Sequence, residues 1–143
     1  MTLYLDTSSL VKLYVAEPGT DDVRRLVDDA AVVATSLIAY VEMRAALARR
    51  RREKALTARD YSTVRRAFDQ DWPAYVAIEV SAPLCREAGD LAERYRLRGY
   101  DSIHLAAYAE VVRRAGSAHT RFSSFDRGLT RAARALARSL ARG

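Results

Sequence analysis

The sequence has one cysteine, two histidines, three prolines and no long hydrophobic run. Cys85 has no partner for a disulfide within the chain, which is typical of proteins from a reducing compartment. The longest uncharged stretch covers only residues 30–41, whereas a membrane span requires roughly 20 apolar residues. Asp6 interrupts the apolar start of the chain, so we expect no signal peptide. These absences predict a cytoplasmic protein that does not cross a membrane.

Disorder and a multidomain organisation are also disfavoured. Hydrophobic residues make up 50% of the 143 positions and are spread along the whole length, which is enough to bury a core. No low-complexity linker or internal repeat divides the chain. We therefore expect residues 1–143 to form a single domain.

Lysine is also scarce, although the chain is basic. Lys and Arg outnumber Asp and Glu by 24 to 18, and only Lys12 and Lys54 are lysine. Arginine binds phosphates and carboxylates through a planar two-pronged fork, so this surface suits nucleic acid or acidic protein segments. GC-rich coding also produces arginine-rich proteins, and charge alone therefore leaves contact with nucleic acid open.

Short apolar runs alternate with amphipathic segments along the chain. The runs predict strands over residues 1–5, 31–35, 75–80 and 119–123. The helical periodicity predicts helices over residues 8–15, 20–29, 37–52, 58–71, 83–97, 101–115 and 127–140. This alternation is typical of an α/β fold with a mainly parallel sheet between helices. Ligands of such sheets bind at the carboxyl ends of the strands, where we expect Asp6 and Asp126 to lie.

Glu42 occupies an unusual position for a carboxylate. Its neighbours three and four residues away are apolar, which places it on the face of its helix that should meet the core. An unpaired buried carboxylate costs several kcal/mol, so we expect an arginine partner, a bound cation or a protonated side chain. The sequence leaves these alternatives open.

Three other acids stand at predicted element boundaries. Asp6 ends the first strand, Asp101 opens a helix and Asp126 follows the last strand. Each of them, taken singly, is explained as a helix cap or a turn residue. The predicted topology allows them to face one crevice together with Glu42, where four carboxylates would repel one another unless divalent cations neutralised them.

The available donors favour a hard metal ion. Oxygen-only ligands prefer Mg²⁺ or Mn²⁺, whereas a zinc site would use cysteine or histidine. The only histidines, His104 and His119, are not spaced as zinc ligands. An acidic metal cluster in a basic protein is typical of a nuclease.

Four segments, taken in order, resemble the PIN domain and specifically the VapC-type toxins of bacterial toxin–antitoxin pairs. They are LYLDTSSLVK at residues 3–12, TS through Glu42 at 35–42, LRGYDSIHLA at 97–106 and SFDRGL at 124–129. The last segment has Ser124 where that family more often has threonine. The resemblance implies a three-layer α/β/α fold around a mainly parallel sheet of about five strands.

The resemblance also implies metal-dependent endoribonuclease activity that leaves a 5′-phosphate and a 3′-hydroxyl. Asp6 and Asp101 are then the principal ligands of Mg²⁺ or Mn²⁺, Glu42 completes the site or orients water, and Asp126 assists. Ser8 and Ser124 have two open roles, which are hydrogen bonding to these carboxylates and helix capping.

An RNA substrate and a cognate antitoxin protein are the implied partners. An arginine stripe on the last predicted helix suits RNA phosphates, an acidic antitoxin tail or simple solvation; its members are Arg127, Arg131, Arg134, Arg138 and Arg142. The helix over residues 37–47 carries more apolar surface than a small sheet requires. We expect part of it, together with residues 11–14, to bind a second copy in a homodimer or an antitoxin helix.

Three other classes of protein compete with this interpretation. A DNA-directed or flap-type nuclease shares the chemistry but usually has a longer chain with extra helices. A receiver-like phosphorylation domain also gathers acids at strand ends, but it needs an acidic pair after the first strand and a late lysine, which this chain lacks. A non-catalytic PIN domain that only binds RNA is the closer alternative. The presence of all four acids favours the enzyme.

Overall fold

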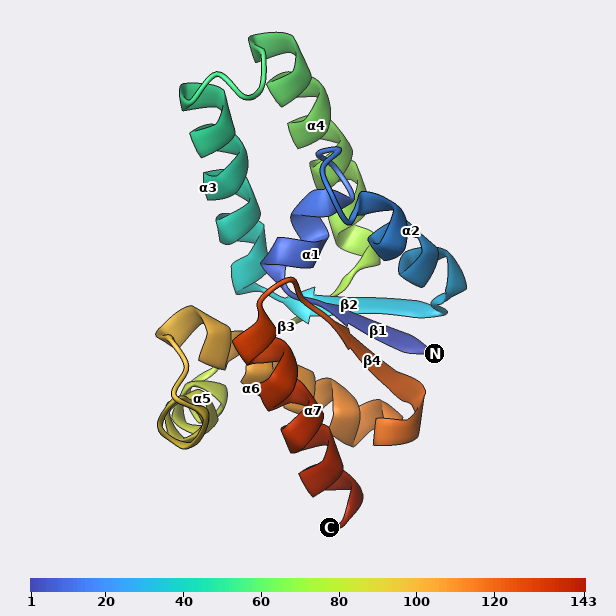
Figure 1. Cartoon of the computed structure of the whole chain (residues 1–143), viewed down its shortest axis with the longest axis vertical. Helices are drawn as coiled ribbons and strands as arrows, with labels where there is room; N and C mark the ends of the chain where they lie inside the picture. The colour runs from blue at the N-terminus through green and yellow to red at the C-terminus, as the bar shows by residue number, and fades with distance from the viewer.

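Four parallel strands form the centre of the computed structural model, which describes residues 1–143 (Figure 1). They are β1 (Thr2–Leu5), β2 (Val32–Ser36), β3 (Val76–Ile78) and β4 (Thr120–Ser123), and they pair in the order β3-β2-β1-β4. All three pairings are parallel. The four apolar runs of the sequence therefore form the strands they predict. The sheet lacks the fifth strand implied by the family resemblance, because no further segment of the chain pairs with either edge strand, β3 or β4.

Seven α-helices connect and follow the strands. They are α1 (Thr7–Lys12), α2 (Thr20–Asp29), α3 (Ile38–Arg52), α4 (Ala58–Asp71), α5 (Ala82–Tyr95), α6 (Gly99–Ala115) and α7 (Arg127–Ala141). Two 3₁₀ turns, η1 (Trp72–Ala74) and η2 (Ser117–His119), precede β3 and β4. Each helix coincides with one amphipathic segment of the sequence to within a few residues. None of the helices is long and apolar enough to cross a membrane.

The helices cover both faces of the sheet. Helices α1 to α4 lie on one side and α5 to α7 on the other (Figure 1). Alternation along β1 separates the two cores, because Leu3 and Leu5 pack with the first group whereas Tyr4 packs with the second. The expected three-layer α/β/α architecture is thus confirmed.

The topology of the sheet fixes the place of the candidate site. From β1 the chain proceeds to β2 on one side, whereas β4 arrives later on the other side, so the strand order reverses between β1 and β4. Leu5 pairs with Ser123, which aligns the carboxyl ends of these two strands. Ligand sites of open α/β sheets lie at such switch points. Asp6 and Asp126 follow the two strands there.

The apolar surface expected around α3 is only partly free. Leu37 and Val41 are exposed, but Tyr40 stacks on Phe68 of α4. The expectation that residues 11–14 add to this surface is wrong for Val11, which lies in the core between the sheet and α1 to α4. Because Val11 is used for packing, the free apolar surface in this region lies at the start of α3, beside Trp72 of η1.

Candidate active site

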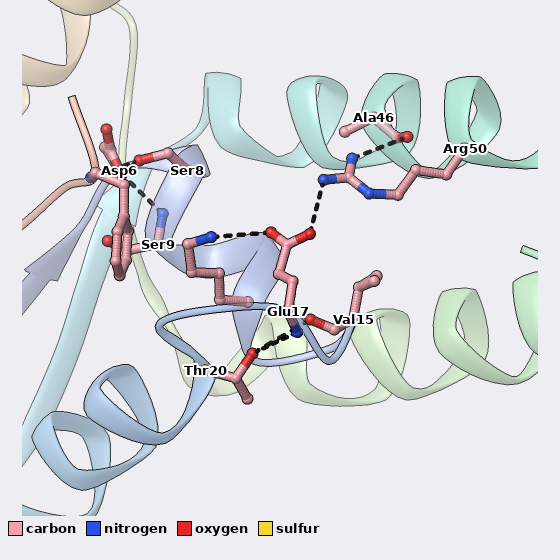
Figure 2. A network of polar contacts seen from close by, with 10 residues as sticks. Asp6, Ser8, Ser9, Val15, Glu17, Thr20, Ala46 and Arg50 are labelled. Carbon is pink, nitrogen blue, oxygen red and sulfur yellow. Dashed lines mark hydrogen bonds and ion pairs between the residues drawn. The ribbon is translucent and has the colours of Figure 1, made fainter. Parts of the chain in front are cut away.

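Asp6 is a buried carboxylate at the end of β1. Its Oδ1 accepts hydrogen bonds from the backbone N–H of Ser9 at 3.0 Å and from Ser8 Oγ at 2.7 Å (Figure 2), so it caps α1. Its Oδ2 accepts from Ser124 Oγ at 2.5 Å. Burial raises the pKa of Asp6 above its ordinary value, and these three hydrogen bonds offset that effect only in part. No ion pair compensates its charge.

Ser124 links Asp6 to Asp126. The backbone N–H of Asp126 donates to Ser124 Oγ at 3.0 Å, and Ser124 in turn donates to Asp6. Asp126 caps α7 by accepting from the backbone N–H of Leu129 at 2.8 Å. Ser8 Oγ also accepts from the backbone N–H of Phe125 at 2.9 Å, which ties the start of α1 to the β4–α7 turn. The two roles left open for Ser8 and Ser124 are therefore resolved in favour of hydrogen bonding to Asp6.

Glu42 lies at the edge of the buried stripe of α3. Its side chain is 27% exposed, whereas Ala39, Met43 and Leu47 form the stripe itself. Glu42 Oε1 accepts hydrogen bonds from Thr7 Oγ1 and from His104 Nε2, both at 2.7 Å. Burial acts to raise the pKa of Glu42, but the hydrogen bonds from His104 and Thr7 bring it below its ordinary value. Of the partners considered from the sequence, arginine is not the one found, because the basic side chain that contacts Glu42 is His104.

His104 is the site residue that the sequence reasoning missed. The buried imidazole stands between the Tyr4 hydroxyl, 2.8 Å from Nδ1, and Glu42. When the Tyr4 hydroxyl donates to Nδ1, the Nε2–H is free to donate to Glu42, so one tautomer satisfies both contacts. The signal for this role is its spacing, since His104 follows Asp101 by three residues and therefore shares its face of a helix.

Asp101 lies in the first turn of α6 with its side chain 22% exposed. The helix has no side-chain cap, so Asp101 acts on its N-terminus through charge rather than through a capping hydrogen bond. Its ion-pair partner is Arg98, whose Nε lies 3.4 Å from Oδ2. Because the side chain of Arg98 is 84% exposed, this pair is weak and leaves the Asp101 carboxylate available to a ligand.

Hydrogen bonds link three of the four predicted acids, since Asp6 and Asp126 share Ser124, and Thr7, next to Asp6, bonds Glu42. Asp101 shares no hydrogen bond with them and is related to Glu42 only through His104, which follows it by one turn of α6. No three carboxylate, histidine or cysteine side chains lie close enough together to hold a metal ion in this arrangement. The donor chemistry nevertheless fits a hard divalent cation, since the donors are oxygens and Asp6 carries a buried charge without a counter-ion.

A second polar network fixes the loop beside α1. Glu17 lies between Lys12 of α1, whose Nζ is 3.1 Å from Oε1, and Arg50 of α3, whose Nη2 is 3.3 Å from Oε2 (Figure 2). The backbone N–H of Glu17 donates to Thr20 Oγ1 at 3.0 Å. Burial acts to raise the pKa of Glu17, but Lys12 and Arg50 together bring it below its ordinary value.

This network predicts a pH-dependent loss of stability in Glu17→Gln. A lowered folded-state pKa stabilises the fold above the ordinary carboxyl value and loses that contribution as the pH falls through the folded-state pKa. We expect Glu17→Gln to lower the free energy of unfolding by about 1–2 kcal/mol at neutral pH. Urea titrations of both proteins should converge under acidic conditions, and a constant difference at every pH would contradict this role.

Comparison with known proteins agrees with this geometry. The family model described as PIN domain matches residues 3–135. The chain belongs to the PIN-domain family. This PIN domain is 36% identical to "Ribonuclease VapC45" of Mycobacterium tuberculosis (strain CDC 1551 / Oshkosh) over 109 aligned residues. The aligned residues make up 76% of each of the two chains. The same values hold for "Ribonuclease VapC49" of Mycobacterium tuberculosis (strain ATCC 25618 / H37Rv). The resemblance stated from the sequence motifs is thus confirmed.

Solved structures share the PIN fold. Mycobacterium tuberculosis VapC20, described as a sarcin-ricin loop cleaving toxin, superposes with a TM-score of 0.66 at 21% identity and covers 91% of this chain and 94% of its own. FitAcB from Neisseria gonorrhoeae superposes with a TM-score of 0.69 at 16% identity and covers 92% and 93%, respectively. At these identities the likeness shows the fold alone.

Proposed function

We propose that this PIN-domain chain is a metal-dependent endoribonuclease, the toxin of a toxin–antitoxin pair, with residues 1–143 acting as one nuclease domain. The observation that carries the proposal is Asp6, a buried carboxylate without a counter-ion at the switch point of the sheet. Two curated relatives named ribonuclease VapC support the class of reaction.

The residues proposed to hold the Mg²⁺ or Mn²⁺ ion are the four acids singled out in the sequence, Asp6, Glu42, Asp101 and Asp126. Asp6 and Asp101 are the principal ligands, Glu42 completes the site or orients water, and Asp126 assists. When bound, such an ion lowers the pKa of water and stabilises the negative charge that develops on the phosphate.

The side chains around these acids position them. Ser8 and Ser124 hold the two oxygens of Asp6, and they also set the direction of the β4–α7 turn that carries Asp126. Thr7 and His104 hold Glu42. Such supporting hydrogen bonds fix ligand orientation and maintain ligand basicity. In the proposed reaction a water oxygen attacks the phosphorus and the bond to the 3′ oxygen breaks, which leaves a 5′-phosphate and a 3′-hydroxyl.

A defined oligonucleotide tests the reaction class. We expect the purified protein to cleave a single-stranded oligoribonucleotide with Mg²⁺ or Mn²⁺ and to be inactive with EDTA. The matched oligodeoxyribonucleotide should remain intact. Cleavage of both polymers would make the chain a general nuclease. Binding of RNA without cleavage under every metal condition would favour the non-catalytic alternative.

The same proposal includes partner proteins and a place in the cell. We propose that the chain acts in the cytoplasm on RNA, and that a cognate antitoxin inhibits it. An apolar groove between α3 and η1, lined by Leu37, Tyr40, Val41, Asp69 and Trp72, is the surface on which either the antitoxin or a second copy would dock.

Sedimentation distinguishes these occupants. A homodimer that uses the groove should dissociate in Val41→Asp, because that change places a charge at an exposed apolar position that lines the groove. A wild-type chain that remains monomeric at high concentration would contradict the homodimer. The antitoxin would then be the remaining proposed occupant of the groove.

A further inference from the structure

Helix α7 is unusual in its charge. It is the only helix that carries arginine without any acidic residue; the arginines are Arg127, Arg131, Arg134 and Arg138, and Arg142 follows at its end. All five side chains belong to exposed residues, and none takes part in an ion pair. The exposed arginines on the other helices have acidic residues on the same helix. The α7 stripe is therefore an uncompensated cationic surface.

Part of this stripe lines a groove that reaches the candidate active site. The groove runs from the β4–α7 turn along the first two turns of α7 and is lined by Ser124, Phe125, Asp126, Arg127, Thr130, Arg131 and Arg134. Its volume of about 460 Å³ lies in the range of pockets that hold a small molecule, so it has room for a nucleotide unit. Two of its lining residues, Ser124 and Asp126, belong to the hydrogen-bonded chain that includes Asp6. The groove therefore includes Asp126 and lies next to Asp6, which Ser124 contacts.

Phe125, one of the residues that line this groove, presents an aromatic surface. Its residue is 47% exposed, which is high for phenylalanine. The ring is held on its inner side, because Lys12 Nζ lies 4.4 Å from the ring centroid. Gly19 packs so closely that a Cβ added there would lie 2.6 Å from the ring. The ring is thus fixed in place while much of it faces solvent.

We propose that this groove, termed the α7 groove, binds the substrate RNA strand next to the phosphate that is cleaved. Arg127, Arg131 and Arg134 would contact the backbone phosphates, and Phe125 would stack on a base beside the acidic site. Cationic grooves combined with aromatic platforms are the general means of binding single-stranded nucleic acid. This inference rests on the proposed function for the class of substrate and adds the place and orientation of the strand.

An acidic protein segment is the competing occupant. Such a segment would also pair with the arginines, but it would have no use for an exposed aromatic ring held beside the catalytic carboxylates. The exposed ring of Phe125 therefore favours RNA.

The test measures binding without cleavage. A fluorescein-labelled single-stranded oligoribonucleotide is titrated with protein in EDTA, and anisotropy is followed over a range of salt concentrations. The variant Arg131→Gln/Arg134→Gln removes two charges from the groove. Its matched control, Arg52→Gln/Arg59→Gln, removes two exposed charges from the ends of α3 and α4 that lie at the opposite end of the molecule from α7 (Figure 1).

We expect the groove variant to bind about tenfold or more weakly at about 50 mM salt. Each phosphate contact to a single strand contributes roughly 0.7 to the slope of log affinity against log salt, so the slope should fall by about 1.4. The control should change the slope by less than half of that. Equal effects of the two double variants on RNA binding would contradict the proposal that RNA binds in the α7 groove.

The aromatic ring is tested separately with a conservative pair. Phe125→Leu keeps apolar packing against Lys12 and Gly19 but removes the aromatic face, whereas Phe125→Tyr keeps it. We expect Phe125→Leu to weaken RNA binding by roughly 5- to 100-fold and Phe125→Tyr to bind as the wild type does. Equal binding by these two variants would contradict base stacking.

The outcomes separate this inference from the proposed function. If the wild type cleaves RNA but the two double variants bind RNA equally well, the α7 groove is not the RNA-binding site, although the proposed nuclease activity stands. If the wild type binds RNA through the α7 groove but never cleaves it, the groove is the RNA-binding site and the proposed nuclease activity is wrong. If Arg131→Gln/Arg134→Gln loses binding to a polyglutamate peptide but binds RNA as the wild type does, the occupant of the α7 groove is an acidic protein segment and not RNA.

Discussion

Replacing Asp6 with asparagine is expected to lower RNA cleavage by about a thousandfold while leaving the fold intact. The loss follows from the removal of a principal metal ligand. The fold should survive because asparagine retains an oxygen that accepts from the backbone N–H of Ser9 and from Ser8 Oγ. Single-turnover cleavage of the oligoribonucleotide measures the loss, and circular dichroism checks the fold.

The raised pKa of Asp6 also predicts how the stability of the wild type and of Asp6→Asn depends on pH. Because burial raises the pKa of Asp6 above its ordinary value, the folded chain holds the proton more tightly than the unfolded chain. The free energy of unfolding therefore falls as the pH rises from about 4 through the folded-state pKa. At neutral pH and without metal, Asp6→Asn should then be at least as stable as the wild type.

Metal ions should make the wild type more stable than Asp6→Asn. Saturating Mn²⁺ at about 100 times its dissociation constant would stabilise the wild type by roughly 2.7 kcal/mol and leave Asp6→Asn almost unchanged. Thermal melts with Mn²⁺ and with EDTA read this difference independently of RNA cleavage. An Asp6→Asn protein that is unfolded without metal would show that the carboxylate is structural and would contradict its role as a ligand.

Replacing His104 with alanine should affect both stability and cleavage. The change removes a buried ring and leaves the Tyr4 hydroxyl and Glu42 without their shared partner. We expect a loss of about 3 kcal/mol in the free energy of unfolding. We also expect cleavage to fall by about 10- to 100-fold, since Glu42 loses the hydrogen bond that orients it.

Tyr4→Phe is the matched control for His104→Ala. It removes only the hydroxyl on the far side of the imidazole and keeps the stacking of the ring on Phe122. Its loss of stability should be no more than about 1.5 kcal/mol, and its cleavage should stay closer to that of the wild type. Urea titrations give the stabilities, and cleavage is compared at a temperature at which all three proteins are folded. Full activity of folded His104→Ala would contradict the positioning role.

The sequence predicted the elements of this fold well for a physical reason. The runs that become strands are short and mostly apolar, and those that become β2 and β3 are rich in β-branched residues, while the segments that become α2, α4, α5 and α7 carry clear apolar periodicity. Residue alternation within β1 then determined which core each side chain enters. The number of strands was overestimated only where the family resemblance, rather than the pattern of residues, supplied it.

Long-range partners were harder to predict. Periodicity places Glu42 near a buried face, but the sequence offers 22 arginines as partners, and His104 lies 62 positions away from Glu42. The spacing of His104 from Asp101 indicates a shared helix face, but it does not show that His104 bonds Tyr4 and Glu42. Similarly, the arginine stripe was visible from its spacing, whereas its junction with Phe125 and Asp126 in one groove depends on the β4–α7 turn.

The most direct test of the proposed function is a map of RNA 5′ ends. Total bacterial RNA is incubated with wild type or with Asp101→Asn, in Mg²⁺ or Mn²⁺ and in EDTA, and new 5′-phosphate ends are sequenced. We predict discrete new ends that require both the metal and Asp101, and these ends would also identify the RNA. New ends of equal abundance in EDTA, or in Asp101→Asn, would contradict a carboxylate-bound metal ion as the centre of the reaction.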